Sequence, residues 1–241
     1  MKAGFSIRQG VLGLLAVALL SGCASTASRE DPLEGYNRAM YSFNEQVDRY
    51  VARPAARAYQ RAVPAVVRTG VGNFTGNLED PWIGINNVLQ GKFADGLNDL
   101  MRFVFNSTFG LLGVIDIATP MGLVKHDEDF GQTLGRWGVG EGVYVVLPVF
   151  GSRTLRDAAA LPLDYIAEHP HIDHVPTRNS YGALYFVHVR STLLGAEKTL
   201  DEGSIDKYAY MRDFYLQQRR YKVVDGNLAP NYDEYDDFDD E

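Results

Sequence analysis

The 241-residue sequence contains a single cysteine, which excludes an internal disulfide, a cysteine-ligated zinc site and a cysteine-ligated iron–sulfur cluster. It also lacks an excess of positive charge, because 31 acidic residues outnumber 23 lysines and arginines and give a formal net charge of −8. Such a chain matches the phosphate backbone poorly, so we expect no nucleic-acid partner. With 46% apolar and 22% charged residues, most of the chain is expected to fold.

The chain also lacks a long apolar run beyond residue 23. Its longest stretch there without an acidic or basic side chain is 103–115, which has 13 residues. A membrane-spanning helix needs about 20 apolar residues. Any association of this part of the chain with a membrane is therefore expected to depend on an anchor and on amphipathic surfaces.

Several catalytic motifs are missing from the sequence. It has no Gly-x-Ser-x-Gly elbow, no phosphate-binding Walker loop and no His-Glu-x-x-His pair. The histidine-rich run 169–174 (HPHIDH) is a weak metal candidate, because Pro170 and Pro176 place it in a loop. The acidic turn 127–129 lacks the ligand spacing and central glycine of a calcium-binding EF-hand. We therefore expect no metal site.

The first residues have the features of a secretory signal. Lys2 and Arg8 flank the start of the chain, and the short apolar run 11–20 (VLGLLAVALL) follows. The only cysteine comes next, in the sequence Leu-Ser-Gly-Cys that ends at Cys23. This resembles the lipobox of bacterial lipoproteins and implies cleavage before Cys23 and acylation of that cysteine. An ordinary cysteine behind an N-terminal anchor is the less favoured alternative.

These features predict how the N-terminal segment is divided. We expect a lipoprotein signal peptide at 1–22 and a lipidated tether at 23–30. Two or more acyl chains on one residue suffice for stable anchoring to a membrane. Ala24 rather than an aspartate follows the cysteine, which in lipoproteins implies export to the outer membrane, facing the periplasm.

The body of the chain is dominated by helical patterns. Residues 31–34 (DPLE) make a favourable helix start, with a capping aspartate and a proline at the first helical position. We expect this helix to end at Arg53-Pro54, and Pro64 to separate two short helical pieces after it. The apolar residues of the first helix are spaced three and four apart and fall on one face: Leu33, Tyr36, Met40, Phe43, Val47 and Tyr50.

The segment 97–112 predicts a more unusual helix. Apolar side chains cover most of its circumference and leave a narrow polar stripe of Asn98, Asp99, Arg102 and Asn106. A helix this apolar is buried in protein or in lipid. Because burying the stripe without partners would be costly, it should face water, a polar cavity or itself. Periodicity does not separate a lipid-facing helix from an ordinary buried helix with one wet edge.

A glycine-rich region spans 131–151. Its segment GVGEG at 138–142 precedes a strand and opens no helix, so we do not interpret it as a nucleotide-binding loop. The alternating Gly138, Gly140 and Gly142 predict a flexible hinge or a tight hairpin turn. The β-branched and aromatic run 143–147 is the one convincing strand.

Three further helices and a charged tail are expected after this region. Ser152 is a candidate cap for a short helix that ends near Pro162, and two longer helices are expected over about 179–200 and 205–222. Seven of the last nine residues, 233–241, are acidic. Their mutual repulsion predicts a solvated, disordered tail.

Several long runs of this sequence occur in an order typical of one family. They are DPLEGYNR at 31–38 with MYSFN at 40–44, VARP at 51–54, NFTGNL at 73–78 with Pro81, the stretch 102–116, FGQTLG at 130–135 continuing to 148, and GSRTLRD at 151–157. Together they resemble the MlaA (VacJ) family of phospholipid-transport outer-membrane lipoproteins. The similarity covers about residues 30–225 and is looser over 163–205, and the acidic tail lies outside it.

The resemblance implies a fold and a function. The fold is a mainly α-helical, ring-like single domain of amphipathic helices over 31–226, with a small glycine-rich β-hairpin region, followed by an acidic disordered tail at 227–241. It lies in the inner leaflet of the outer membrane and surrounds an amphipathic channel. Mislocalised phospholipids leave the outer leaflet through this channel and pass to a soluble periplasmic carrier. Family members associate with trimeric porins, and the resemblance implies neither catalysis nor a cofactor.

Three sets of residues are candidates for this function. Cys23 is the expected lipidation site. Asn98, Arg102 and Asn106 are candidates for the polar lining of the channel, with Arg102 able to meet a lipid phosphate. The alternating glycines at 138–142 are candidates for a gate hinge.

Two other functions stay open at this point. A membrane-anchored phospholipase would degrade the same misplaced lipids, but it needs a nucleophile for which the sequence offers no motif. A structural lipoprotein that binds porins would need no lipid movement at all.

Overall fold

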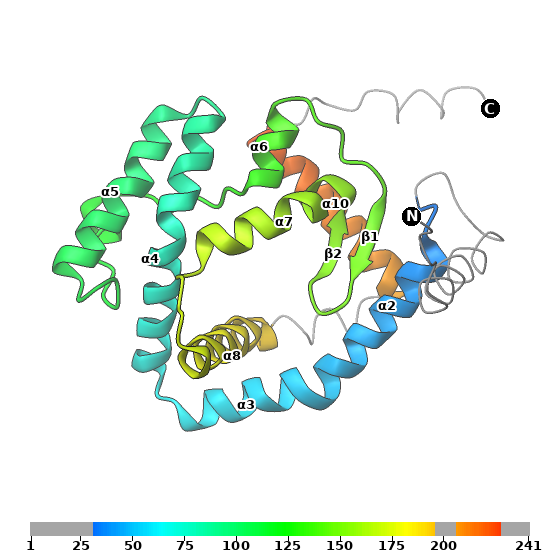
Figure 1. Cartoon of the computed structure of the whole chain (residues 1–241), viewed down its shortest axis with the longest axis horizontal. Coiled ribbons are helices and arrows are strands. Elements are labelled where there is room, and N and C mark those ends of the chain that lie inside the picture. Colours follow the sequence, from blue (N-terminus) through cyan, green and yellow to red (C-terminus); the bar gives the residue numbers. More distant parts are fainter. Residues whose placement is uncertain (1–30, 196–205, 228–241) are drawn as a thin grey trace, which may run out of the picture.

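The computed structural model describes residues 31–195 and 206–227, so the predicted signal peptide, the tether with Cys23 and residues 228–241 of the tail lie outside the described residues. The described chain is mainly α-helical with one two-stranded antiparallel sheet. Figure 1 shows the elements following one another around a ring-like outline, with α7 (Leu155–Glu168) and α8 (Val175–Thr192) towards its inside. The predicted fold class, a helical ring with a small β-hairpin, is confirmed.

One side of the ring is a nearly continuous helical rod. Helix α2 covers Glu34–Val47, the π-helical turn η1 covers Asp48–Ala52, and α3 covers Arg53–Ala62. The expected helix end at Arg53-Pro54 is therefore wrong. The wider π turn comes directly before Pro54, and a proline near the start of a helical segment loses no backbone bond that the segment needs.

Helix α4 forms the adjoining side of the ring. It covers Ala65–Leu89, so Pro64 breaks the chain as expected, but the piece that follows is long rather than short. Pro81 lies inside this helix. A proline in a helix interior removes one hydrogen bond and favours a kink without necessarily ending the helix.

Helix α5 (Phe93–Phe109) folds back against α4 through a short connection (Figure 1). The two helices approach most closely at Gly84 and Gly96. A Cβ atom on Gly96 would lie 2.8 Å from the carbonyl oxygen of Gly84 and 2.6 Å from a methyl group of Val88. Small residues at both positions therefore permit the close packing of this helical hairpin.

The glycine-rich region contains a helix and the sheet. Helix α6 covers Phe130–Arg136, and the strands are β1 (Tyr144–Leu147) and β2 (Gly151–Thr154), with Tyr144 opposite Thr154. The strand over 143–147 is thus confirmed, and β2 is the second strand of the expected β-hairpin. The hairpin turn is formed by 148–150, so the alternative that the glycines at 138–142 form it is wrong.

The remaining helices extend further than expected or are shifted. Thr154, not Ser152, caps α7 by accepting a hydrogen bond from the backbone N–H of Asp157 at 3.2 Å. The helix continues through Pro162, so the expected end there is wrong for the same reason as at Pro81. The other elements are η2 (Thr119–Met121), η3 (Leu193–Gly195) after α8, and α10 (Lys207–Val223).

Burial in this structure is inverted relative to a typical water-soluble domain. Among the described residues, eight apolar side chains are buried, whereas twenty-one polar or charged residues are. Large apolar side chains instead crowd the surface. Soluble monomers rarely expose apolar patches of more than a few hundred Å², and a larger patch marks a membrane or protein interaction site. The sequence therefore folds with much of its polar chemistry inside.

Candidate functional site

The outer surface of α5 is apolar and exposed. Phe93, Leu97 and Phe109 are 70%, 60% and 65% exposed, and Val104 between them is 50% exposed. Along with the leucines of the following turn, they form an apolar face about as long as the helix. Contact with water is unfavourable for such a face. The face is therefore suited to contact with lipid or with an apolar partner surface.

The turn after α5 adds strained backbone to this exposure. Leu111 and Leu112 adopt φ angles of 51° and 58°, and Gly113 follows with φ 93°. The left-handed conformation is unfavourable for a residue with a branched apolar side chain. Both leucines are nonetheless about 70% exposed, at 69% and 70%. A strained turn that presents two leucines outward is more suited to contacting lipid than to stabilising the fold.

The inner face of α5 carries the predicted polar stripe, and its side chains contact other parts of the protein. Arg102 is 3% exposed and donates to the carbonyl oxygen of Leu123 at 2.6 Å and to the hydroxyl of Thr119 at 3.0 Å. It also lies 3.7 Å from the buried carboxylate of Asp80 on α4 and 3.4 Å from Asp116.

Asn106 and Asn98 are occupied in the same way. The side-chain oxygen of Asn106, which is 3% exposed, accepts from the backbone N–H groups of Ile117 and Ala118 at 2.8 and 2.9 Å. Asn98 donates to the carbonyl oxygen of Val124 at 2.7 Å. The folded-back segment 116–124 thus supplies partners to the stripe, as buried polar groups require. A lumen role for these three side chains stays a prediction.

An apolar groove lies between α4 and α8. It has a volume of about 520 Å³, and its walls are almost entirely apolar. Residues more than a hundred positions apart in the sequence meet here, namely Val66, Val67, Gly70, Val71, Phe74 and Thr75 from α4, Val114 from the turn region, and Tyr181, Leu184 and Tyr185 from α8. A groove of this size and character is suited to hydrocarbon chains.

A polar pocket of about 260 Å³ lies among β2, α7 and α10. Its wall carries both signs of charge, with Arg153 from β2, Asp164 and Glu168 from α7, and Arg219 and Lys222 from α10. Polar groups of opposite sign around one pocket suit a polar ligand that itself carries both charges.

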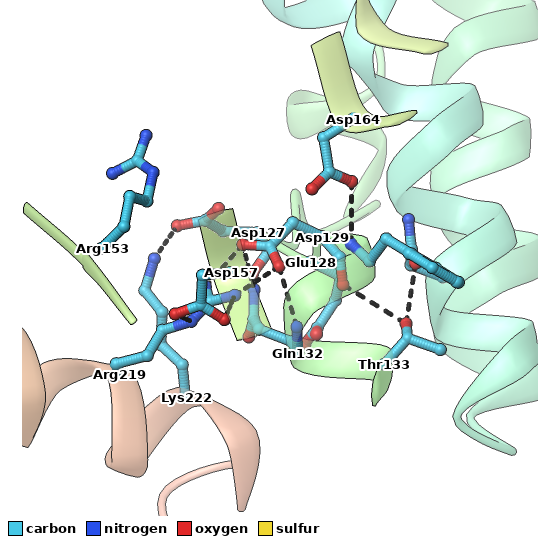
Figure 2. A network of polar contacts seen from close by, with 12 residues as sticks. Asp127, Glu128, Asp129, Gln132, Thr133, Arg153, Asp157, Asp164, Arg219 and Lys222 are labelled. Atoms are coloured by element: carbon cyan, nitrogen blue, oxygen red, sulfur yellow. Dashed lines mark hydrogen bonds and ion pairs between the residues drawn. The ribbon is translucent and has the colours of Figure 1, made fainter. Parts of the chain in front are cut away.

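One side of this pocket is a closed network of ion pairs. Figure 2 shows Arg219 pointing between Asp129 and Asp157, and its guanidinium donates to Asp129 at 2.5 and 2.6 Å and to Asp157 at 2.9 Å. Burial acts to raise the pKa of both carboxyls, but the charge and hydrogen bonds of Arg219 outweigh it, so both pKa values are lowered. Lys222 donates to Asp127 at 2.5 Å (Figure 2). These charges are matched within the protein.

A second set of carboxyls connects the pocket with the groove. Burial and the charges of neighbouring carboxylates, Glu79 of α4 first, raise the pKa of Glu168 to about 8. Burial also raises the pKa of Glu79, whose carboxylate accepts a hydrogen bond from the hydroxyl of Tyr185 at 3.2 Å. Tyr185 lines the apolar groove, so this hydrogen bond joins the groove wall to Glu79, whose charge in turn acts on Glu168 of the pocket.

Two asparagines of α2 hold the free edge of the hairpin. Asn37 is fully buried, donates to the carbonyl oxygen of Tyr144 at 3.1 Å and accepts from the N–H of Val146 at 2.8 Å. One helical repeat of seven residues later, Asn44 donates to Leu147 at 2.9 Å and accepts from Val149 at 2.7 Å. Within the described part of the chain β1 pairs with β2 alone, and the two side-chain amides take the place of a neighbouring strand on its other edge.

The predicted hinge glycines lie between α6 and β1. Gly138 and Gly142 adopt φ angles of 91° and 69°, which favour glycine, and a Cβ on Gly142 would come within 2.9 Å of Leu155. A Cβ on Gly140 would meet no atom within 4 Å. Gly138 and Gly142 are therefore needed for the shape of this connection, and a hinge role for the three glycines stays a prediction.

The histidine run is in a loop between α7 and α8, as expected. His169 stacks on Tyr165 at 4.4 Å between ring centroids and packs edge-on against Tyr185 at 4.8 Å. His171 pairs with the exposed Asp173 at 3.0 Å. Within 31–195 and 206–227, no three side chains of His, Cys, Asp or Glu meet in an arrangement suited to a metal ion.

Sequence reasoning missed the groove, the mixed-charge pocket and the asparagine contacts to β1. The two asparagines have a signal in hindsight, since they recur at a spacing of seven on one face of a predicted helix. The groove has none, because its walls come from segments whose pairing no local pattern specifies.

Comparisons with known proteins agree on one family. A family model described as MlaA lipoprotein matches residues 29–222. The chain is 40% identical over 226 residues to the intermembrane phospholipid transport system lipoprotein MlaA of Shigella flexneri, covering 90% of this chain and 89% of that protein. The protein of the same name from Escherichia coli K12 is 39% identical with the same coverage, and that from Haemophilus influenzae is 33% identical over 90% of each chain.

A solved structure is also similar. It comes from work on the structural basis for maintenance of bacterial outer membrane lipid asymmetry, and it superposes with a TM-score of 0.70 at 36% sequence identity. The match covers 81% of this chain and the whole of the other. Among the described residues, no helix combines the length and the hydropathy that a membrane crossing requires.

Proposed function

Because the chain belongs to the MlaA lipoprotein family, we propose that it acts in intermembrane phospholipid transport and removes mislocalised phospholipids from the outer leaflet of a Gram-negative outer membrane. An acylated Cys23 anchors it to that membrane, and its apolar faces lie within the inner leaflet. The phospholipid moves along an amphipathic path inside the ring and passes to a soluble periplasmic carrier. A trimeric porin is the expected neighbour in the membrane.

The observation that carries this proposal is the apolar groove between α4 and α8, whose wall residue Tyr185 donates a hydrogen bond to the acidic Glu79. A phospholipid must keep its acyl chains away from water and its headgroup away from hydrocarbon, so a path for it needs both surfaces side by side. The exposed apolar face of α5 supports the placement in a leaflet, because it removes the need for a spanning helix.

The first experiment measures phospholipid in the outer leaflet of cells that lack this protein. Wild type should restore lipid asymmetry, and the Cys23→Ala variant should not, since the chain then has no acyl anchor. Rescue by Cys23→Ala at equal abundance would contradict the anchoring role. Release of free fatty acid in place of lipid transfer would favour the phospholipase.

A groove variant tests the path itself. Leu184→Lys places a charge on the groove wall, where Leu184 is 43% exposed, and should abolish rescue while leaving the protein folded. Val189→Lys on the same helix is the matched control, because Val189 is 41% exposed and does not line the groove. If both variants restore asymmetry while porin binding is intact, a structural porin-associated role is the better account.

A further inference from the structure

The charges of the polar pocket are not all matched within the protein. Arg219 pairs with Asp129 and Asp157, Lys222 pairs with Asp127, and Asp164 accepts hydrogen bonds from the indole N–H of Trp82 at 2.8 Å and the backbone N–H of Phe130 at 2.9 Å. Among the described residues this leaves Arg153 as the base, and Asp164 and Glu168 as the acids, of the pocket wall without a charged partner, and of the two acids only Glu168 also lacks a hydrogen bond.

The acid is Glu168, at the end of α7. Its side chain is partly buried and forms neither a hydrogen bond nor an ion pair with any residue in the described part of the chain. The neighbouring carboxylates surround it with negative charge, and its partial burial strengthens their electrostatic effect. A cation brought to this position would therefore be stabilised more than at an ordinary surface glutamate.

The base is Arg153, on β2. Its guanidinium donates to the adjacent carbonyl oxygen of Ser152 at 2.8 Å and forms no ion pair within the described residues. Figure 2 shows it pointing away from the pairs around Arg219. The remaining guanidinium donors are suited to a phosphate, which arginine binds through two parallel hydrogen bonds.

We infer that this pocket holds the headgroup of a zwitterionic phospholipid, with its ammonium at Glu168 and its phosphate at Arg153, and that the chain selects such lipids over anionic ones. The inference rests on the proposed function and names the substrate class of the same path. Its acyl chains occupy the apolar groove, whose wall residue Tyr185 is linked through Glu79 to Glu168 of the pocket. An anionic phospholipid without an amine offers no cation to Glu168, so its headgroup leaves this side chain without a partner.

The test is a competition between two lipids for the purified full-length lipidated protein. The protein is incubated with equimolar mixed micelles of phosphatidylethanolamine and phosphatidylglycerol, re-isolated, and its bound lipid is quantified by mass spectrometry. We expect wild type to hold about threefold to fivefold more phosphatidylethanolamine than phosphatidylglycerol, the ratio of one partly exposed ion pair. Glu168→Gln should bind as much total lipid but without this preference.

Matched variants separate the two charges. Arg153→Gln should lower the binding of both lipids without changing their ratio, because both carry the phosphate. Glu45→Gln on α2 and Arg178→Gln on α8 make the same chemical changes outside the pocket and should behave like wild type. Equal binding of the two lipids by wild type, or an unchanged ratio in Glu168→Gln, would overturn the inference but not the proposed function. Wild type that holds no phospholipid at all would overturn both.

The preference should also depend on pH. Raising the pH from about 6.5 to about 8.5 crosses the raised pKa of Glu168, so its carboxylate forms and the preference for the ammonium lipid increases. A preference that stays constant over this range in wild type would assign it to another group. The groups facing Glu168 from the packed elements are Glu79, Tyr185, Asp164, the Asp127–Lys222 and Asp129–Arg219 pairs, and Arg153.

Discussion

The α4–α5 hairpin and the interior between α7, α8 and α10 both contain polar side chains, but they treat them differently. Between α4 and α5 buried polar groups pair with one another, as where Asn87 donates to Asp99 at 2.8 Å and Arg102 forms ion pairs with Asp80 and Asp116. In the interior pocket, Glu168 and Arg153 have no charged partner among the described residues. Matched polar groups hold the fold together, and unmatched ones are available for a ligand.

The apolar surfaces of the two regions also differ, because one is an open face and the other is a groove. Outside, α5 presents apolar side chains in an open face along the helix, which suits the many loosely held tails of a bilayer. Inside, the apolar residues of α4 and α8 surround a groove of about 520 Å³, which suits the chains of one lipid molecule.

The largest expected effect comes from removing a charge in the matched region. Arg102→Ala removes ion pairs with Asp80 and Asp116 and leaves Lys125 as the cation beside the buried Asp80, so we expect a loss of about 2–3 kcal/mol in the free energy of unfolding. Denaturant unfolding in detergent measures it. Arg153→Ala, which breaks no ion pair, should change stability by less than about 0.5 kcal/mol. Similar losses in both variants would remove the distinction between matched and unmatched charges.

A smaller loss in the free energy of unfolding is expected when a larger side chain is placed where α4 and α5 approach most closely. Gly96→Ala places a methyl group within 2.8 Å of the backbone of Gly84, so the helices must separate, at a cost of about 1–3 kcal/mol. Gly182→Ala in α8 is the matched control, because no atom lies within 4 Å of the new methyl group there. It should stabilise by about 0.5–1 kcal/mol through helix propensity. Thermal unfolding of the two variants should therefore shift in opposite directions.

Substitution of Leu112, in the turn after α5, should change the stability of the protein and its binding to membranes in opposite directions. Leu112→Gly removes a left-handed leucine, so we expect a gain of about 1 kcal/mol in stability together with weaker binding to phospholipid vesicles. Leu112→Asn tolerates the same backbone and should weaken vesicle binding as well. Vesicle flotation and thermal unfolding check both outcomes. Unchanged flotation of the two variants would show that the turn does not contact lipid.

The smallest effect is a pH dependence at Glu168. Its pKa is about 8 in the folded protein, against an ordinary value of 4.5, so the folded state holds a proton that the unfolded state releases between these values. The stabilisation is complete below the unfolded pKa and is lost as pH rises through 8. Glu168→Gln should therefore melt above wild type at about pH 8.5, by about 2–4 °C, and close to it at about pH 5. Parallel melting temperatures at both values would contradict the raised pKa.

Much of the secondary structure could be predicted from local patterns. The helix starting near Asp31, the strand over 143–147 and the helix near 205–222 are all present, because spacing and capping act within a few residues. The helix ends expected at two prolines are wrong. Pro54 and Pro162 were expected to end helices, but each lies inside a longer helical run whose packing outweighs the loss of one backbone bond.

The candidate site could be predicted only in part. Periodicity correctly placed Asn98, Arg102 and Asn106 on one polar face of a helix. It does not say what that face contacts, and in the folded chain the segment 116–124 supplies partners to it, while a channel role for these residues stays a prediction. On a chain with inverted burial, the polar face of a helix is its packed side, so the usual interpretation of amphipathicity is reversed.

The sequence alone determined the family, the expected acylation of Cys23, and the helical and apolar character of the segments, because these depend on residues that are close together in the chain. The tertiary structure decided which polar groups are matched and which are free. It also decided that Val66 and Tyr185 line one groove and that Arg153 and Glu168 face one pocket. These are contacts between distant segments, and their formation depends on how whole helices pack, which no local pattern specifies.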